Sequence, residues 1–184
     1  MTIIKMTDRD MKVINFIKEF KMASTSTIAR LFFPSKATAE KRLRKLVDNR
    51  KLFRTRETIL DEYVYYIKRP TNIKHCLMIA EVYSKLMTDS NIQVIKCKRE
   101  YEIKFRAKTL RTDLMAVIRT KDNKLIPVII EIDLTKKYKN KYDDYIQSRY
   151  YQQKFPVSPV IVCISNRTPQ SNIPVKWLKL NEIK

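Results

Sequence analysis

Apolar residues near the start of the chain recur at the spacing of amphipathic helices. A first helix, which Asp8 can cap, carries its apolar side chains at Met11, Ile14, Ile17 and Phe20. A second, short helix can be capped by Ser24 or Thr25 and ends at Pro34. Its inward side chains are Ile28, Leu31 and Phe32. The pattern predicts two consecutive helices joined by a short connection.

A third helix is predicted from 36 to 49, with Ser35 as its cap. Its core-facing residues are Ala39, Leu43, Leu46 and Val47. The opposite face gathers Thr38, Lys41, Arg42 and Lys45. Two strand-like runs at 52–59 and 62–68 follow and predict a hairpin. Three helices with an appended hairpin are typical of a winged helix-turn-helix, whose recognition helix enters the DNA major groove.

The remainder of the chain alternates between strand and helix patterns after Pro70. A helix is expected from Asn72, and another over 136–154. The strand-like runs are 92–98, 101–108, 111–120, 127–134, 158–165 and 175–180. The polar turn 121–124 predicts an antiparallel hairpin. We therefore expect an α/β (α+β) protein with a mixed sheet, divided into domains at 1–69 and 70–184.

Charge changes this picture, because the chain carries 39 Lys and Arg against 19 Asp and Glu, a net charge of +20. The stretch 36–56 alone holds nine basic residues against Glu40 and Asp48. An excess of this size predicts a polyanionic partner, which can be DNA, RNA or an acidic membrane surface. The winged helix-turn-helix pattern favours double-stranded DNA among these. The alternative is that the basic residues form only a solvated helix face.

Composition excludes several other classes of protein. The chain has no glycine, which excludes phosphate-binding loops that depend on it. Its three cysteines are widely spaced, which argues against a zinc site or a disulfide framework. No run of about 18 apolar residues is present, so no membrane association is expected. Charges near the N-terminus disfavour a signal peptide, and we expect a cytoplasmic protein.

The candidate DNA-binding residues follow from the third helix and the hairpin. They are Lys36, Thr38, Lys41, Arg42, Lys45, Arg54 and Arg56. The lysines and arginines suit phosphate contacts, whereas Thr38, Lys41 and Arg42 are placed to reach base edges.

A second candidate site consists of acidic residues at strand ends. Glu131 and Asp133 are two residues apart and share one strand face, and hairpin pairing can bring Asp113 beside them. Three carboxylates that converge repel one another unless a cation intervenes. Mg²⁺ suits such oxygen ligands and can activate water against a phosphodiester. The alternative is that these acids pair with nearby lysines, in which case no cofactor is expected.

The segments STSTIARLFFPSKATAEKRLRKLVDNRKLFR, RTDLMAVI and VIIEIDLTKKYKNKYDDY carry a family resemblance. The first resembles the winged helix of the replication-relaxation proteins of plasmids, phages and conjugative elements. The other two resemble that family's second half, which is similar to the PD-(D/E)XK nuclease fold. The resemblance covers nearly the whole chain.

The resemblance implies roles for particular residues. Asp113 matches the first acid and Glu131 the second, and both would hold the metal in an active enzyme. Asp133 stands where an active nuclease has lysine, and Lys137 or Lys141 could substitute for that lysine. Glu81 could match an extra acid of some members. The departure at Asp133 implies a degenerate site, in which a lysine reaches the carboxylates.

The sequence therefore predicts a DNA-binding accessory protein of a mobile element, acting in replication, conjugative transfer or transcription control. One alternative is a Mg²⁺-dependent endonuclease. Another is an assembly factor that recruits a relaxase or a replication initiator through the second domain. A homodimer is a further expectation.

Overall fold

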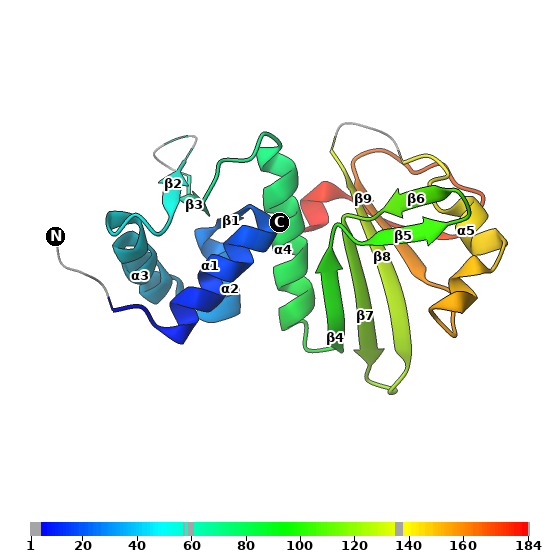
Figure 1. The fold of residues 1–184 in the computed structure, drawn as a ribbon, viewed down its shortest axis with the longest axis horizontal. Coiled ribbons are helices and arrows are strands. Elements are labelled where there is room, and N and C mark those ends of the chain that lie inside the picture. The colour runs from blue at the N-terminus through cyan, green and yellow to red at the C-terminus, as the bar shows by residue number, and fades with distance from the viewer. Residues whose placement is uncertain (1–4, 57, 59–60, 135–137, 184) are drawn as a thin grey trace. The chain divides into compact units, whose positions relative to one another are not determined.

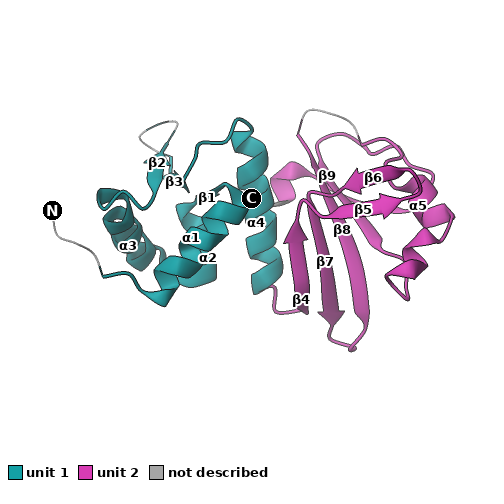
Figure 2. Cartoon of the chain, viewed as in Figure 1, with its two compact units in different colours: residues 1–88 teal, residues 89–184 magenta. Residues whose placement is uncertain are grey.

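The fold of the chain was obtained as a computed structural model that describes residues 5–56, 58, 61–134 and 138–183 (Figure 1). The chain divides into two compact units, unit 1 at 1–88 and unit 2 at 89–184 (Figure 2). We expected the boundary at Pro70. It lies later because the helix after Pro70 packs against elements of unit 1. No helix in the described residues has the length and apolar character needed to cross a membrane.

Unit 1 contains four helices and three short strands within its described residues. The sheet order is β1-β3-β2, with both pairings antiparallel. The elements are α1 (Asp8–Phe20), β1 (Met22–Ser24), α2 (Thr25–Phe32), α3 (Lys36–Asp48), β2 (Phe53–Thr55), β3 (Val64–Tyr66) and α4 (Ile73–Thr88). The three predicted helices and the hairpin are present, whereas β1 was not expected.

The helices of unit 1 begin where side chains cap them. Ser24 and Ser35 cap α2 and α3 as predicted, by accepting backbone N–H groups of Thr27 and Thr38. The cap of α1 is Thr7 and not Asp8, because Thr7 forms a reciprocal capping box with Asp10. The buried faces of the three helices meet in one apolar core. Its fully enclosed side chains include Val13, Ile17, Phe20, Ile28, Ala39, Leu43 and Leu46.

One buried ion pair joins α1 to α3. The Asp10 side chain is 1% exposed and receives hydrogen bonds from Nε of Arg42 at 2.8 Å and from a second guanidinium nitrogen. Arg42 also donates to the backbone oxygen of Lys5 at 2.9 Å. This partner lowers the pKa of Asp10 to about 2. Our expectation that Arg42 faces solvent is therefore wrong, because its guanidinium neutralises a carboxylate that the core has enclosed.

A second polar network holds α4 on α2. Glu81 accepts hydrogen bonds from the Thr27 hydroxyl at 2.8 Å and from Arg30 at 2.7 Å. Arg30 also donates to the Ser84 hydroxyl at 2.6 Å. The carboxylate of Glu81 is thus engaged within unit 1, so the match of Glu81 to an extra nuclease acid is not supported by its contacts.

Unit 2 is built on a five-stranded mixed sheet of order β10-β9-β8-β7-β4. The strands β4, β7 and β8 are antiparallel neighbours, and β8, β9 and β10 are parallel. Their bounds are β4 (Ile92–Arg99), β7 (Leu114–Thr120), β8 (Leu125–Asp133), β9 (Val160–Ser165) and β10 (Val175–Leu178). The mixed sheet and the hairpin at 121–124 are confirmed.

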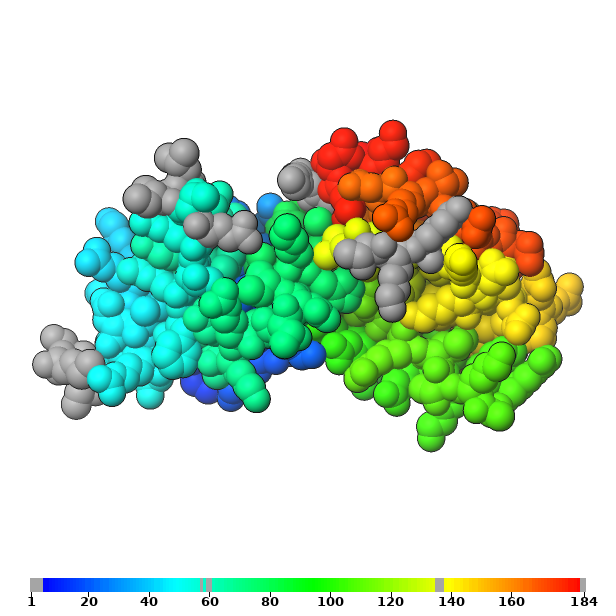
Figure 3. All heavy atoms as spheres, turned by 90° about the horizontal axis from the view of Figure 1, so that it is seen from above, coloured from blue at the N-terminus to red at the C-terminus, as the bar shows by residue number. Residues whose placement is uncertain are grey.

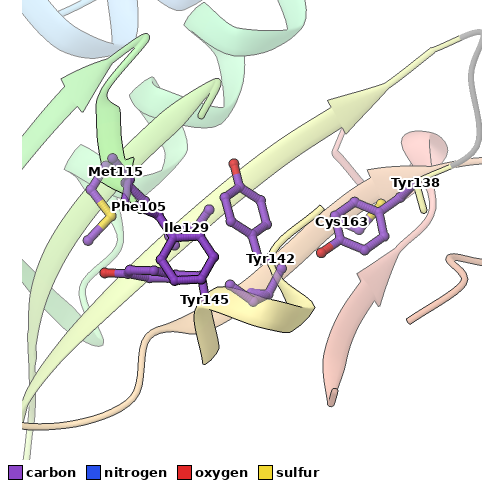
Figure 4. Packing of buried hydrophobic residues seen from close by; sticks show 9 residues of the cluster. Phe105, Met115, Ile129, Tyr138, Tyr142, Tyr145 and Cys163 are labelled. Carbon is purple, nitrogen blue, oxygen red and sulfur yellow. The ribbon is translucent and has the colours of Figure 1, made fainter. Parts of the chain in front are cut away.

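A separate hairpin and short helical turns complete unit 2. They are β5 (Glu102–Phe105), β6 (Lys108–Arg111), α5 (Asp143–Gln147) and the 3₁₀ turns η1 (Tyr150–Gln153) and η2 (Leu180–Ile183). We expected 101–108 to be a single strand, but it turns back at Arg106. Ile103 and Phe105 on one face of the hairpin then pack into the aromatic cluster of Figure 4, together with Met115, Ile129, Tyr138, Tyr142, Tyr145, Ile161 and Cys163.

The expected long helix over 136–154 is wrong for its described part. Asn140 and Arg149 have backbone φ of 42° and 56°, values that a right-handed helix does not contain. The described part of this stretch instead contains an isolated β-bridge at Lys139, the short helix α5 and the 3₁₀ turn η1. Tyrosines at 138, 142 and 145 are all buried, although the segment is not one continuous helix.

The ion pair between α1 and α3 generates a prediction for stability. Replacing Arg42 by Met leaves the Asp10 carboxylate with its hydrogen bonds from Thr7 but without its cation, which we expect to cost about 2 kcal/mol in the free energy of unfolding. Lys41→Ala on the exposed side of the same helix should change it by less than about 0.5 kcal/mol. Urea denaturation at neutral pH measures both. Equal stabilities for the two variants would show that the ion pair has no structural role.

Candidate nucleic-acid interface and acidic site

The exposed side of α3 carries most of the predicted DNA-binding residues. Lys36, Thr38, Lys41 and Lys45 are all exposed, as is the neighbouring Arg44. Atoms of the stretch that contains α3 and β2 lie on the molecular surface in the space-filling view (Figure 3, cyan). Lys36 lies 3.5 Å from the Glu62 carboxylate. We call Lys36, Thr38, Lys41, Arg44 and Lys45 the α3 basic face. Arg42 is not part of it, since its guanidinium is bound to Asp10.

Two arginines on the hairpin of unit 1 stack on one tyrosine. The guanidinium carbons of Arg54 and Arg56 lie 4.1 and 4.8 Å from the centre of the Tyr63 ring. Cation–π contacts of this kind hold the arginine stems while the charge stays accessible. Arg54 is half-buried and Arg56 exposed. Sequence reasoning named both arginines but missed Tyr63, although it stands opposite them across the hairpin.

The predicted acids lie at one end of the β7–β8 hairpin in unit 2. The register pairs Leu114 with Ile130, so Asp113 and Glu131 come next to each other just beyond it. Asp113 accepts a hydrogen bond from the backbone N–H of Ile132 at 2.7 Å. Asp133 shares the strand with Glu131, and the Cys163 thiol lies 3.9 Å from its carboxylate. The structure thus brings Asp113 close to Glu131, as strand pairing predicted.

Glu131 is the enclosed member of this set, with 6% exposure. Lys141 donates to both of its carboxylate oxygens, at 2.9 Å each, and the Tyr142 hydroxyl also donates to one of them. Burial raises the pKa of Glu131 to about 7, opposed by the charge of Lys141 and assisted by that of Asp113. Burial and the Glu131 charge also raise the pKa of Tyr142.

A hollow of about 510 Å³ opens beside these residues. Glu131, Asp133 and Lys141 lie on one side of it, and the β5–β6 hairpin contributes Phe105 and Lys108. The mixture of acidic and basic side chains gives the hollow no single charge. Of the two lysines that the sequence offered as substitutes, Lys141 reaches Glu131, and Lys137 lies outside the described residues.

The acids do not fit a divalent metal as they stand. Both carboxylate oxygens of Glu131 are bonded to Lys141, whose ammonium occupies the approach to them. Among the residues that the structure describes, no group of three or more His, Cys, Asp or Glu side chains is arranged to hold a metal ion. Of the Mg²⁺ ligands expected at Asp113 and Glu131, Glu131 therefore has a lysine for a partner, and Asp113 accepts the backbone N–H of Ile132.

Two groups at this site were not predicted from the sequence. They are Tyr142, which donates a hydrogen bond to Glu131, and the backbone oxygen of Arg111, which accepts one from Lys141. Tyr142 could have been found, because it follows Lys141 directly in the sequence. The carbonyl oxygen carries no sequence signal, since every residue has one.

Comparisons with known proteins give no family for this chain. No protein-family model and no curated protein matches it. The crystal structure of protein VC1899 from Vibrio cholerae matches 81% of this chain at 13% identity, with a TM-score of 0.38. The chain spans 40% of that protein's length. A likeness at this level carries no argument about function.

The raised pKa of Glu131 predicts a pH-dependent stability. The folded state holds the proton more tightly than the unfolded chain does, so this contribution is complete below about pH 4.5 and is lost as the pH rises through about 7. Between pH 5 and 8 the parent should lose about 2.5 kcal/mol of unfolding free energy relative to Glu131→Gln, which cannot ionise. Denaturation curves of both proteins across this range measure the difference. Parallel pH profiles would contradict it.

Proposed function

We propose that this protein binds duplex DNA through unit 1, as an accessory factor of a mobile genetic element. The observation that carries the proposal is the α3 basic face, which stands beside two arginines stacked on Tyr63. Three helices followed by a hairpin, with α3 after a short connection from α2, is an order compatible with a winged helix-turn-helix. In that arrangement α3 would enter the major groove.

The charges of unit 1 support contact with phosphates. Lys41 and Lys45 are one helical turn apart on α3, so both side chains can reach one DNA strand. Arg54 and Arg56 lie on the hairpin and would contact the backbone beyond the groove. Of the residues first assigned to base edges, Thr38 and Lys41 keep that proposed role. Arg42 would act indirectly, by fixing α3 on α1.

For unit 2 we propose a PD-(D/E)XK-like fold with a degenerate site. The antiparallel strands β4, β7 and β8, the short helix α5 and the parallel strand β9 follow one another in an order compatible with it. The contacts of Lys141 with Glu131 favour this over the alternative of a Mg²⁺-dependent endonuclease. Recruitment of a relaxase or replication initiator through unit 2 is the other alternative, and a homodimer would give a two-fold footprint on DNA. A footprint across the operon and origins of its element would identify the site and the process served.

The α3 basic face generates a binding prediction. Lys41→Glu/Lys45→Glu reverses two exposed charges, and we expect it to weaken binding to a mixed-sequence duplex by at least about tenfold, since each lost phosphate contact removes counterion release. Fluorescence anisotropy with a labelled duplex measures the affinity.

The matched control is Lys121→Glu/Lys176→Glu, which makes the same charge change on exposed lysines of unit 2. It should bind like the parent, apart from a small effect of net charge. If both double variants weaken binding equally, the attraction is a property of the whole charge and not of α3.

Salt dependence gives a separate test. If α3 and the hairpin neutralise roughly six phosphates, log K should fall against log salt with a slope of about −5. The α3 double variant should have a slope about two units shallower. Affinity that hardly changes between low and physiological salt would contradict the proposed phosphate contacts.

A further inference from the structure

Unit 2 contains a cation site that its own chain fills. The Lys141 ammonium donates to three oxygen atoms: the two carboxylate oxygens of Glu131 at 2.9 Å and the backbone oxygen of Arg111 at 2.5 Å. An ammonium group has three hydrogens, so this set satisfies it. Carboxylate and carbonyl oxygens are also the ligands that hard divalent cations prefer.

The surroundings of this ammonium require a positive charge. Glu131 is buried, and the neighbouring Asp113 adds a second negative charge next to it. Asp133 lines the same hollow from the same strand face. A buried carboxylate without a cation is strongly unfavourable. Lys141, with its side chain 34% exposed, supplies the cation from the segment before α5.

We infer that Lys141 is a built-in counter-ion that takes the place of a divalent metal at Glu131 and the backbone oxygen of Arg111. The native site is therefore independent of metal, and removing the ammonium exposes a latent cation site. The hollow beside Lys141 is also lined by Glu131, so an ion in it can approach that carboxylate. The inference does not depend on DNA binding by unit 1.

The experiment compares the full-length parent with Lys141→Ala and Lys139→Ala at pH 8, without DNA. Lys139 lines the same hollow and is exposed, so its variant controls for loss of a lysine there. We expect Lys141→Ala to lower the melting temperature by at least about 5 °C, since a buried acid loses its partner. Millimolar Mn²⁺ should restore much of this loss, and should not stabilise the parent or Lys139→Ala.

Two further measurements define the cation. Methylammonium, which can donate hydrogen bonds, should also stabilise Lys141→Ala, whereas tetramethylammonium, which cannot, should have no effect. Glu131→Gln/Lys141→Ala lacks the buried charge and should respond to neither cation. If Lys141→Ala does not fold, Lys141→Gln retains a donor toward Glu131 without the charge, and the same Mn²⁺ response is expected from it.

Metal binding to the parent protein can overturn the inference. Stoichiometric Mn²⁺ binding to the parent by calorimetry, abolished by Asp113→Asn, would show that the native site takes metal in the presence of Lys141. A folded Lys141 variant that neither Mn²⁺ nor methylammonium stabilises would overturn it as well.

Discussion

The hydrogen bonds between the Lys141 ammonium and the buried Glu131 carboxylate join the segment before α5 to the end of β8. Enclosing Glu131 costs solvation energy, which the chain offsets with the ammonium and with the Tyr142 hydroxyl. Those contacts fix residues 141 and 142, and the tyrosines around them then fill the space over the sheet (Figure 4). The contacts of Glu131 with Lys141 and Tyr142 thus link the short α5 and the aromatic cluster to β8.

Unit 1 also buries a carboxylate and pairs it with a cation, but with different residues. Asp10 is enclosed by the packing of α1 on α3, and Arg42 supplies the compensating charge. In both units an acid near one end of a secondary-structure element is buried, and a cation from another segment pairs with it. The arrangement fixes where α3 lies on α1, and hence which of its side chains remain on the outer surface.

Local periodicity was sufficient to predict α1, α2, α3 and the β7–β8 hairpin, because each buries one face whose spacing is visible in the sequence. It was also sufficient to bring Asp113 next to Glu131, since antiparallel register is a local property of a tight hairpin. It failed for Arg42, which looks exposed on a helical wheel, because its partner Asp10 lies 32 residues earlier. It failed again for 136–154, where buried tyrosines imitate a helical face although Asn140 and Arg149 break the helix.

The proposed function concerns basic side chains other than those in these internal ion pairs. Arg42 and Lys141 neutralise buried acids, and Arg30 is bound to Glu81. Lys41 and Lys45 instead stand one turn apart on an exposed face, where like charges repel by roughly 0.2–0.5 kcal/mol. Lys45 itself is favoured by the helix dipole in the last turn of α3, but placing Lys41 one turn before it adds no interaction that stabilises the helix. A polyanion that lies along α3 reverses the sign of this interaction, so the same spacing that disfavours the free protein favours the proposed complex with DNA.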